Sequence, residues 1–293
     1  MLSARRLSVR QFVLGLIFSV AAASAAGADA PADTLAKVRD TGQLVIGFRE
    51  DARPFSYRDE AGNPAGYSVD LCRRIAAAVK DALGMDAIDV VFEPVAVGSR
   101  IDMVSSGAVD IECGSTTHTL ERREQVDFTL LTFITGAEML TRVESEIGDL
   151  GDLVGRNVGV LEATTTEQGL RAALRAQMID ATVETFGRHE EGLAALEDGA
   201  IDAYFADRIL LLGLAGEARD AEALQLSGQF YSYEPYAFML RQGDHGFRRV
   251  ADGALAALFR SGQIWSVYDA HFGNAEPSEL LVALFIVQSL PKR

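Results

Sequence analysis

The sequence predicts an α/β protein built from two lobes of similar design, and three observations support this fold class. Short apolar runs of strand length alternate with segments of helical periodicity along most of the chain. The pattern restarts late in the chain, where segment 153–161 resembles the opening strand unit at 44–48. The tetrapeptide 107–110 (Gly-Ala-Val-Asp) is echoed by 199–202 (Gly-Ala-Ile-Asp), each between a predicted helix and a predicted strand.

The composition is that of an ordinary globular protein. The chain has 293 residues, of which 48% are hydrophobic and 24% charged, so disorder, collagen and coiled coil are excluded. The formal net charge is −15 and the pI is about 4.7. A surface this acidic repels a phosphate backbone, so we expect no nucleic-acid partner.

The first 25 residues have the features of a cleavable secretory signal. Arg5, Arg6 and Arg10 precede an apolar run at 12–23, and an Ala-x-Ala site follows at 23–25. The run is too short to span a bilayer, and we expect export to the periplasm. Removing these residues, among them three arginines and no acid, leaves 268 residues and changes the net charge from −15 to −18. The arginine pair keeps twin-arginine export open beside the general secretory route.

The first lobe begins with alternating strands and helices. Ser68 is expected to cap the first long helix, because Ser is a favoured residue at that position. Strand 89–94 ends at a proline, and the echoed tetrapeptide leads into the last strand. The expected elements are strand 44–48, a turn at 59–64, helix 68–79, strand 89–94, helix 99–106 and strand 109–113.

The second lobe is inserted into the first through two extended segments, 128–142 and 230–240. Its helix after strand 153–161 is expected to open with a capping box, Thr164 to Glu167. Helices at 253–259 and 263–272 then complete the first lobe. The expected boundaries are 34–137 and 238–272 for lobe 1, 138–237 for lobe 2 and 273–293 for a C-terminal tail. The apolar stretch 280–290 is expected to be a docked helix rather than a membrane contact.

A ligand site is expected at the end of the strand that leads into segment 112–117, Glu-Cys-Gly-Ser-Thr-Thr. Open α/β sheets bind ligands at the carboxyl ends of their strands. Arg122 follows five residues after Thr117 and can reach back over this loop. An arginine beside two hydroxyls and free N–H groups is suited to hold a carboxylate through two hydrogen bonds. The alternative is a capped turn with a surface arginine.

Cys72 and Cys113 are the two cysteines of the chain. In an oxidising compartment a disulfide between them is favoured over two buried free thiols. Closing this loop would stabilise the fold by roughly 4 kcal/mol in the chain-entropy model. The few His and Cys residues have no metal-ligand spacing, and no phosphate-binding Gly-x-x-x-x-Gly-Lys loop is present. We therefore expect no metal and no cofactor.

Segment 112–117 followed by Glu121-Arg122 resembles the signature of periplasmic amino-acid-binding proteins of ABC importers, most closely the glutamate/aspartate-binding branch. The resemblance runs from about residue 33 to 272 and includes segments 47–50, 54–57, 66–71 and 196–199. It implies a type II two-lobed fold with a double hinge that closes around a free acidic amino acid. It also implies a monomer that delivers this ligand to an ABC permease in the inner membrane.

The resemblance also implies roles for individual side chains at the ligand backbone. Arg122 would bind the α-carboxylate with help from Ser115, Thr117 and Thr165. Asp207, which ends a predicted strand, would accept the α-ammonium. A carboxylate at a strand end can pair with a cation that must lose its water on closure, although an exposed loop aspartate is the alternative.

Three further residues are expected to set side-chain specificity. Arg49 stands where relatives that bind basic amino acids tend to carry an acid, so a cation there argues for an acidic ligand. Arg100 matches a second arginine of the glutamate/aspartate branch, and His189 matches a histidine of its second lobe. The alternatives are a surface salt bridge for Arg49, a helix-face charge for Arg100 and a structural role for His189.

The sequence differs from the glutamate/aspartate-binding branch at two positions, and two other functions remain as alternatives. Val97 replaces a usual Ser and removes a hydroxyl, which leaves glutamine or asparagine open as ligands. Ala163 replaces a usual Gly before the paired threonines. Periplasmic cyclohexadienyl dehydratases share this fold, and Glu162 or His189 could act there as acid or base. A detached ligand sensor is the third reading.

Overall fold

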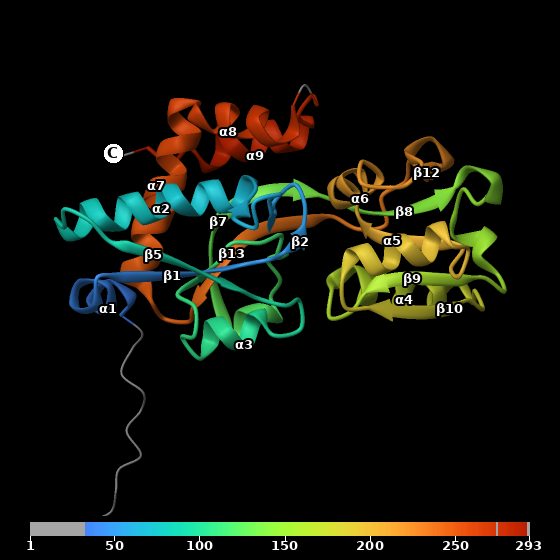
Figure 1. The fold of residues 1–293 in the computed structure, drawn as a ribbon, viewed down its shortest axis with the longest axis horizontal. Coiled ribbons are helices and arrows are strands. Elements are labelled where there is room, and N and C mark those ends of the chain that lie inside the picture. Colours follow the sequence, from blue (N-terminus) through green and yellow to red (C-terminus); the bar gives the residue numbers. More distant parts are fainter. Residues whose placement is uncertain (1–32, 274, 292–293) are drawn as a thin grey trace, which may run out of the picture. The chain divides into compact units, whose positions relative to one another are not determined.

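A computed structural model describes residues 33–273 and 275–291. The expected signal peptide at 1–25 lies outside these residues. The described chain forms two five-stranded mixed sheets and one small three-stranded sheet (Figure 1). The two large sheets define the two lobes, as the alternating sequence pattern predicts.

The first sheet has the order β5-β1-β6-β13-β7. Strands β5, β1 and β6 run parallel, and β13 is antiparallel to both β6 and β7. The strands are β1 (Gln43–Phe48), β5 (Asp89–Pro94), β6 (Ile111–Glu112), β7 (Val126–Thr135) and β13 (Glu234–Arg241). The small sheet of β2 (Asp51–Ala52), β3 (Ser56–Arg58) and β4 (Pro64–Ala65) follows β1.

Six α-helices of the described residues belong to the first lobe. In Figure 1, α2, α8 and α9 lie on one side of its sheet and α3 on the other. The helices are α1 (Thr34–Thr41), α2 (Tyr67–Leu83), α3 (Arg100–Ser105), α7 (His245–Ser261), α8 (Gln263–Phe272) and α9 (Glu279–Gln288). The tail helix α9 buries Leu281, Leu284 and Phe285 in the core of this lobe, so it docks as expected. No helix in the described ranges is both long and apolar enough to cross a membrane.

The second sheet has the order β10-β9-β11-β8-β12. Helix α4 covers one face through Leu170 and Leu174, while α5 and α6 cover the other through Leu196 and Leu211. The elements are β8 (Ala137–Arg142), β9 (Asn157–Leu161), α4 (Thr165–Gln177), β10 (Thr182–Phe186), α5 (His189–Glu197), β11 (Ala203–Asp207), α6 (Arg208–Ala215) and β12 (Leu224–Leu226).

The echoed tetrapeptides occupy equivalent places in the two lobes. The N–H of Asp110 donates to Val45 O at 2.8 Å, and its carboxylate accepts from Val45 N at 2.8 Å. Asp202 makes the same two bonds with Asn157, at 2.7 and 2.9 Å. Each aspartate therefore makes a pair of hydrogen bonds with a parallel strand of its own lobe, β1 in the first lobe and β9 in the second.

The chain passes between the sheets twice, at residues 135–137 and 226–234. A Cβ at Gly136 would come within 2.5 Å of Ser232 O, so glycine permits the two crossings to lie against each other. Strand β13 begins at Glu234, which pairs with Thr135 of β7. Residues 234–237 therefore pair within the first sheet, four residues earlier than the expected boundary.

Four local predictions differ from the structure. Ser68 lies inside α2, where its hydroxyl donates to Gly114 O at 2.7 Å, and Gly66 precedes the helix instead. A Cβ at Gly66 would lie 2.2 Å from Phe55 O, so this helix start requires glycine. Strand β9 begins only at Asn157 because a 3₁₀-helix, Leu150–Leu153, occupies the preceding apolar stretch. Strand β6 is reduced to two residues, and α7 begins well before residue 253.

Two local predictions are confirmed. Cys72 and Cys113 form a disulfide, with Cα atoms 6.4 Å apart, that ties α2 to the strand end after β6. Thr164 caps α4 by accepting from Glu167 N at 3.1 Å. The carboxylate of Glu167 accepts from Ala163 N at 3.0 Å, one residue before the cap itself.

Candidate ligand-binding site

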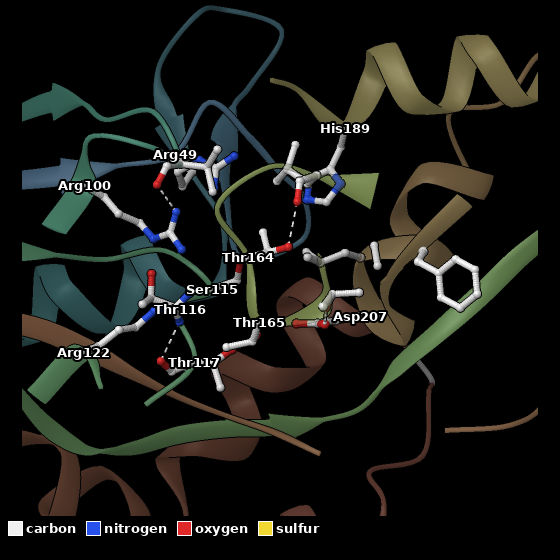
Figure 2. A pocket seen from close by; sticks show the side chains of 16 residues that line it. Arg49, Arg100, Ser115, Thr116, Thr117, Arg122, Thr164, Thr165, His189 and Asp207 are labelled. Carbon is white, nitrogen blue, oxygen red and sulfur yellow. Dashed lines mark hydrogen bonds between the residues drawn. The ribbon is translucent and has the colours of Figure 1, made fainter. Parts of the chain in front are cut away.

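All eight site residues expected from the sequence line one cleft between the two lobes (Figure 2). The free volume inside the cleft is about 30 Å³. The first lobe contributes Arg49, Arg100, Ser115, Thr117 and Arg122, and the second contributes Thr165, His189 and Asp207. Figure 2 shows the three arginines gathered on one side, with His189 and Asp207 on the other.

The three arginines follow the ends of first-lobe strands. Arg49 comes directly after β1, Arg100 begins α3, and Arg122 begins the 3₁₀-helix Arg122–Glu124. Their exposed fractions are only 5%, 4% and 9%. Their charges are therefore largely removed from water, where unpaired charge is costly.

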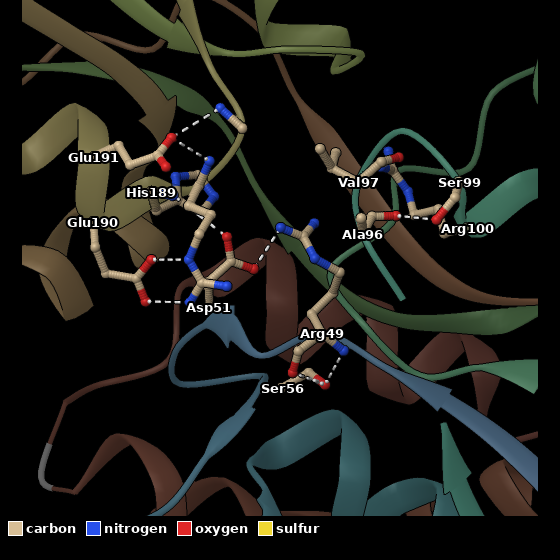
Figure 3. A network of polar contacts seen from close by, with 12 residues as sticks. Arg49, Asp51, Ser56, Ala96, Val97, Ser99, Arg100, His189, Glu190 and Glu191 are labelled. Atoms are coloured by element: carbon tan, nitrogen blue, oxygen red, sulfur yellow. Dashed lines mark hydrogen bonds and ion pairs between the residues drawn. The ribbon is translucent and has the colours of Figure 1, made fainter. Parts of the chain in front are cut away.

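Arg49 is neutralised by Asp51, a residue that the sequence did not single out. The guanidinium and the carboxylate lie 2.5 Å apart (Figure 3). The other Asp51 oxygen accepts from His189 N at 3.3 Å, across the cleft at the start of α5. Burial opposes ionisation of Asp51, but the nearby Arg49 and His189 outweigh it and lower its pKa. Arg49 is thus in a buried ion pair rather than the surface pair considered above.

Arg100 has no ion pair within the described part of the chain. Its guanidinium donates to the carbonyl of Val97 and, at 3.5 Å, to Ala163 O of the second lobe. Its Nε is buried without a hydrogen-bond partner. Burial, together with repulsion from Arg122 and Arg49, lowers its pKa to about 9.

Arg122 reaches back over the loop as the sequence predicts. Its Nη1 donates to Thr117 O at 2.7 Å. Burial lowers its pKa, and the ion pairs found among residues 33–273 and 275–291 do not include it. The cleft therefore holds two buried guanidinium groups without a carboxylate in contact.

Glu112 lies behind this arginine group and was also missed. It is fully buried, its Oε2 accepts from Thr116 at 2.9 Å, and its Oε1 has no partner. A Cβ at Gly114 would lie 2.2 Å from that oxygen, so the glycine leaves room for the carboxylate. Burial raises the pKa of Glu112, although the arginines oppose this shift.

The second lobe presents the N-terminus of α4 to the cleft. Thr164, Thr165 and Thr166 all line it. The first N–H groups of a helix have no acceptor within the helix, and the helix dipole favours an anion there. Ala163 has a positive φ of 54°, the conformation for which glycine is usual, and its carbonyl is the one that meets Arg100.

Asp207 ends β11 and is held by two hydroxyl donors. Thr166 Oγ1 donates to it at 3.0 Å, and the hydroxyl of Tyr236 donates to its other oxygen. Burial, followed by repulsion from Glu234, raises its pKa to about 7. It has no cationic partner among the described residues, so its burial is compensated by hydroxyls alone.

His189 lines the cleft but is already hydrogen-bonded on one ring nitrogen. Its Nδ1 and Tyr204 Oη lie 3.0 Å apart. Burial lowers its pKa to about 4, against the attraction of Asp51, so the ring is neutral at neutral pH. Its other nitrogen is the one that remains for a ligand.

The described residues contain no group of three or more His, Cys, Asp or Glu side chains arranged to hold a metal ion. The polar groups of the cleft are instead guanidiniums, hydroxyls, helix N–H groups, one imidazole and one carboxylate. These groups bind ions of opposite charge without a metal.

A family model for bacterial extracellular solute-binding proteins, family 3, matches residues 44–274. The chain belongs to this family. An L-glutamate/L-aspartate-binding protein from Pseudomonas aeruginosa is 36% identical over 85% of this chain and 83% of its own length. A glutamate/aspartate import solute-binding protein from Salmonella typhimurium is 34% identical over 94% of this chain and 91% of its own length.

A solved structure supports the same fold for this family 3 protein. An ancestral amino-acid-binding protein, described as a precursor of cyclohexadienyl dehydratase, superposes with a TM-score of 0.71. It is 25% identical, and the match covers 82% of this chain and all of the other. The two-lobed α/β fold expected from the resemblance is thereby confirmed.

Proposed function

We propose that this family 3 protein is the substrate-binding protein of an ABC-type importer for glutamate or aspartate. One observation carries the proposal. The cleft holds two buried guanidiniums without an ion pair, Arg100 and Arg122, and one buried carboxylate without a cation, Asp207, among the described residues. Two carboxylates and one ammonium would neutralise these three charges, and an acidic amino acid carries that set.

The proposed binding mode follows from where the charges lie. Arg122, Ser115 and the first N–H groups of α4 take the α-carboxylate, because a helix N-terminus and a guanidinium both favour an anion. Arg100, with its unpartnered Nε, takes the distal carboxylate. Asp207 takes the α-ammonium, and this cation would lower the carboxylate pKa that burial raises.

Arg49 and His189 have supporting roles in this proposal. Arg49 is already neutralised by Asp51, so it orients the distal carboxylate more than it supplies net charge. The free nitrogen of neutral His189 can donate a hydrogen bond to the same carboxylate. An amide side chain would leave the Arg100 charge unpaired, so glutamine and asparagine should bind more weakly than their acids.

The remaining parts of the proposal concern transport. The two crossings serve as a double hinge, the lobes close over the ligand, and the closed monomer delivers it to a permease in the inner membrane. The Salmonella typhimurium relative is a glutamate/aspartate import protein by its name. The signal-like residues 1–25 would direct the chain to the periplasm.

A dehydratase is the less favoured function. Glu162, one acid considered for that role, is exposed and is not among the residues that line the cleft. His189 is neutral and bonded to Tyr204. We propose that this chain is a binding protein rather than an enzyme.

Calorimetric titration of the ligand-free mature protein with each of the twenty amino acids tests the proposal. Glutamate or aspartate should bind most tightly, with a negative heat-capacity change on closure. The matched pair of glutamate and glutamine isolates the Arg100 contact. Binding of only lysine or arginine would contradict the proposal, and turnover of a cyclohexadienyl acid would favour the dehydratase.

A further inference from the structure

Glu234 is a buried carboxylate at the junction of the two lobes that neither the sequence nor the proposed ligand contacts account for. It is 2% exposed and is the first residue of β13, where the chain returns to the first sheet. It pairs with Thr135, at the end of the other crossing strand. A charged group at this place is in position to affect the hinge.

One oxygen of Glu234 joins the two lobes. Its Oε2 accepts from Thr117 Oγ1 of the first lobe and from Thr165 Oγ1 of the second, each at 2.7 Å. The two hydroxyl oxygens lie 3.3 Å apart, and Figure 2 shows both threonines together at one end of the cleft. Two other bonds across the cleft are longer, at 3.3 Å for Asp51 to His189 and 3.5 Å for Arg100 to Ala163. The Tyr236–Asp207 hydrogen bond also joins the lobes, but it contacts neither threonine hydroxyl.

The other oxygen of Glu234 connects to the hinge. Its Oε1 accepts from Ser232 Oγ at 2.5 Å. Ser232 Oγ in turn accepts from the N–H of Ala137, the first residue after the other crossing, at 3.4 Å. A single carboxylate thus contacts the cleft through one oxygen. Through the other it contacts one crossing segment directly and the second by way of Ser232.

The hydrogen bonds to Glu234 determine where the proton and the lone pairs of each threonine hydroxyl point. An ionised carboxylate can only accept, and each hydroxyl has a single proton to donate. Thr117 and Thr165 therefore donate to Glu234 and turn their lone pairs toward the cleft. Lone pairs suit an ammonium group and not a carboxylate, so Glu234 assigns this end of the cleft to the ligand cation, beside Asp207. This differs from the family resemblance, which implied that the two threonines help to bind the α-carboxylate.

We propose that Glu234 is a positioning residue that clasps the two lobes through Thr117 and Thr165 and orients both hydroxyls toward the ligand ammonium. The clasp itself contains no ligand atom and forms whenever the lobes close. Its orienting role rests on the proposed function, because it requires a ligand that carries an ammonium group. Hydrogen bonds to an ionised acceptor are about twice as strong as neutral ones, so losing the charge should weaken the closed state specifically.

The test compares Glu234→Gln with Glu138→Gln as a matched control. Glu138 is also a buried glutamate beside the crossings, but its partners, Arg208 and Gly228, lie within the second lobe and the segment that leaves it. Stopped-flow measurement should show that Glu234→Gln releases bound glutamate about tenfold faster, whereas Glu138→Gln stays within about twofold of wild type. Thermal unfolding of both variants checks that each is folded.

A second set of variants keeps the proposal testable if Glu234→Gln does not fold. Thr165→Val removes one donor and should also speed release about tenfold, while Thr165→Ser restores the hydroxyl and the wild-type rate. Combining Thr165→Val with Glu234→Gln should add less than the two separate effects predict, since both break the same bond. Release within about twofold of wild type for Glu234→Gln, or full additivity, would overturn the clasp.

Small-angle scattering separates failure of the clasp from failure of the proposed function. If no amino acid binds, the proposed function fails but the clasp can still be measured in ligand-free protein. Wild type should then have a smaller radius of gyration than Glu234→Gln, because its lobes close more often. Equal radii in that case would overturn the clasp as well.

Discussion

The two lobes share a scaffold but present opposite chemistry to the cleft. Asp110 and Asp202 bond to β1 and β9, respectively, through the same pair of hydrogen bonds, one from the aspartate N–H and one to its carboxylate. Yet the first lobe contributes all three arginines, whereas the second contributes a helix N-terminus, a neutral histidine and a carboxylate of raised pKa. The repeated positions therefore build the fold, and the positions that differ determine the ligand.

This division also explains why closure matters for binding. Arg100 and Arg122 come from one lobe and Asp207 from the other. Neither lobe alone offers both a cation for a carboxylate and a carboxylate for an ammonium. A zwitterionic ligand gains its full set of ion pairs only when both lobes contact it, which couples binding to closure.

The largest effect is expected on the arginine side of the comparison. Arg122→Ala or Arg100→Met should each cost at least roughly 2–3 kcal/mol of glutamate binding, because a ligand carboxylate is left buried and unpaired. Arg49→Met should cost less, since Asp51 already neutralises that guanidinium. Calorimetry of the three variants provides the measurement. Equal losses at Arg49 and Arg100 would contradict the charge assignment.

The next largest effect is expected at the carboxylate of the second lobe. Asp207→Asn should cost about 2 kcal/mol of binding by removing the partner of the ammonium. Because the pKa of Asp207 is raised to about 7, wild-type affinity should fall as the pH drops below 7, by up to about tenfold per unit. The variant should lose this dependence between pH 7 and 5. An unchanged pH profile would show that another group titrates.

The shared scaffold predicts unequal stability effects. Asp110 is completely buried and also pairs with Lys37 at 2.7 Å, whereas the Asp202 side chain is 21% exposed. Asp110→Ala should therefore destabilise the fold by about 2 kcal/mol, and Asp202→Ala by about 1 kcal/mol, as each leaves a strand N–H unpaired. Urea unfolding measures both values. A larger loss for Asp202→Ala than for Asp110→Ala would contradict the argument that burial sets the size of the effect.

The smallest effect concerns His189 and the pH dependence of stability. Its pKa is about 4 in the folded protein against 6.5 for the free side chain, so in this window the unfolded chain binds the extra proton. Its contribution to stability should fall by about 1 kcal/mol between pH 6.5 and 5.5.

His189→Gln should remove this loss. Asp207 has the opposite sign, because its folded pKa is raised and its contribution is lost as pH rises toward 7. Thermal unfolding of Asp207→Asn at the same two pH values should therefore show a change opposite in sign to that of His189→Gln. If both substitutions changed the pH dependence of the melting temperature in the same direction, the assigned pKa shifts of His189 and Asp207 would be wrong.

Much of the fold could be predicted because its signals are local. Alternation of strand and helix, the echo at 107–110 and 199–202, and the capping threonine all depend on neighbouring residues. The prediction that Ser68 caps α2 was wrong because it considered only neighbouring residues. The helix begins after Gly66, where the close approach of Phe55 O requires a glycine.

The residues of the site likewise divide into those that a local motif predicted and those that it did not. The eight expected residues line one cleft because the family motif carries them. Asp51, Glu112, Glu234 and Tyr236 were missed. Apart from Glu112, whose hydrogen bond is to the nearby Thr116, each contacts a partner that is distant in sequence and that the fold brings close. Glu234, for example, lies 117 residues from Thr117 and 69 from Thr165. No periodicity or short motif in the sequence reports such a contact.

A crystal structure of the protein with glutamate tests the central claim most directly. We expect one carboxylate on Arg122 and the N-terminus of α4, the other on Arg100, and the ammonium on Asp207 between the hydroxyls of Thr117 and Thr165. A ligand whose ammonium lies among the arginines, or whose carboxylates contact neither Arg100 nor Arg122, would contradict the account.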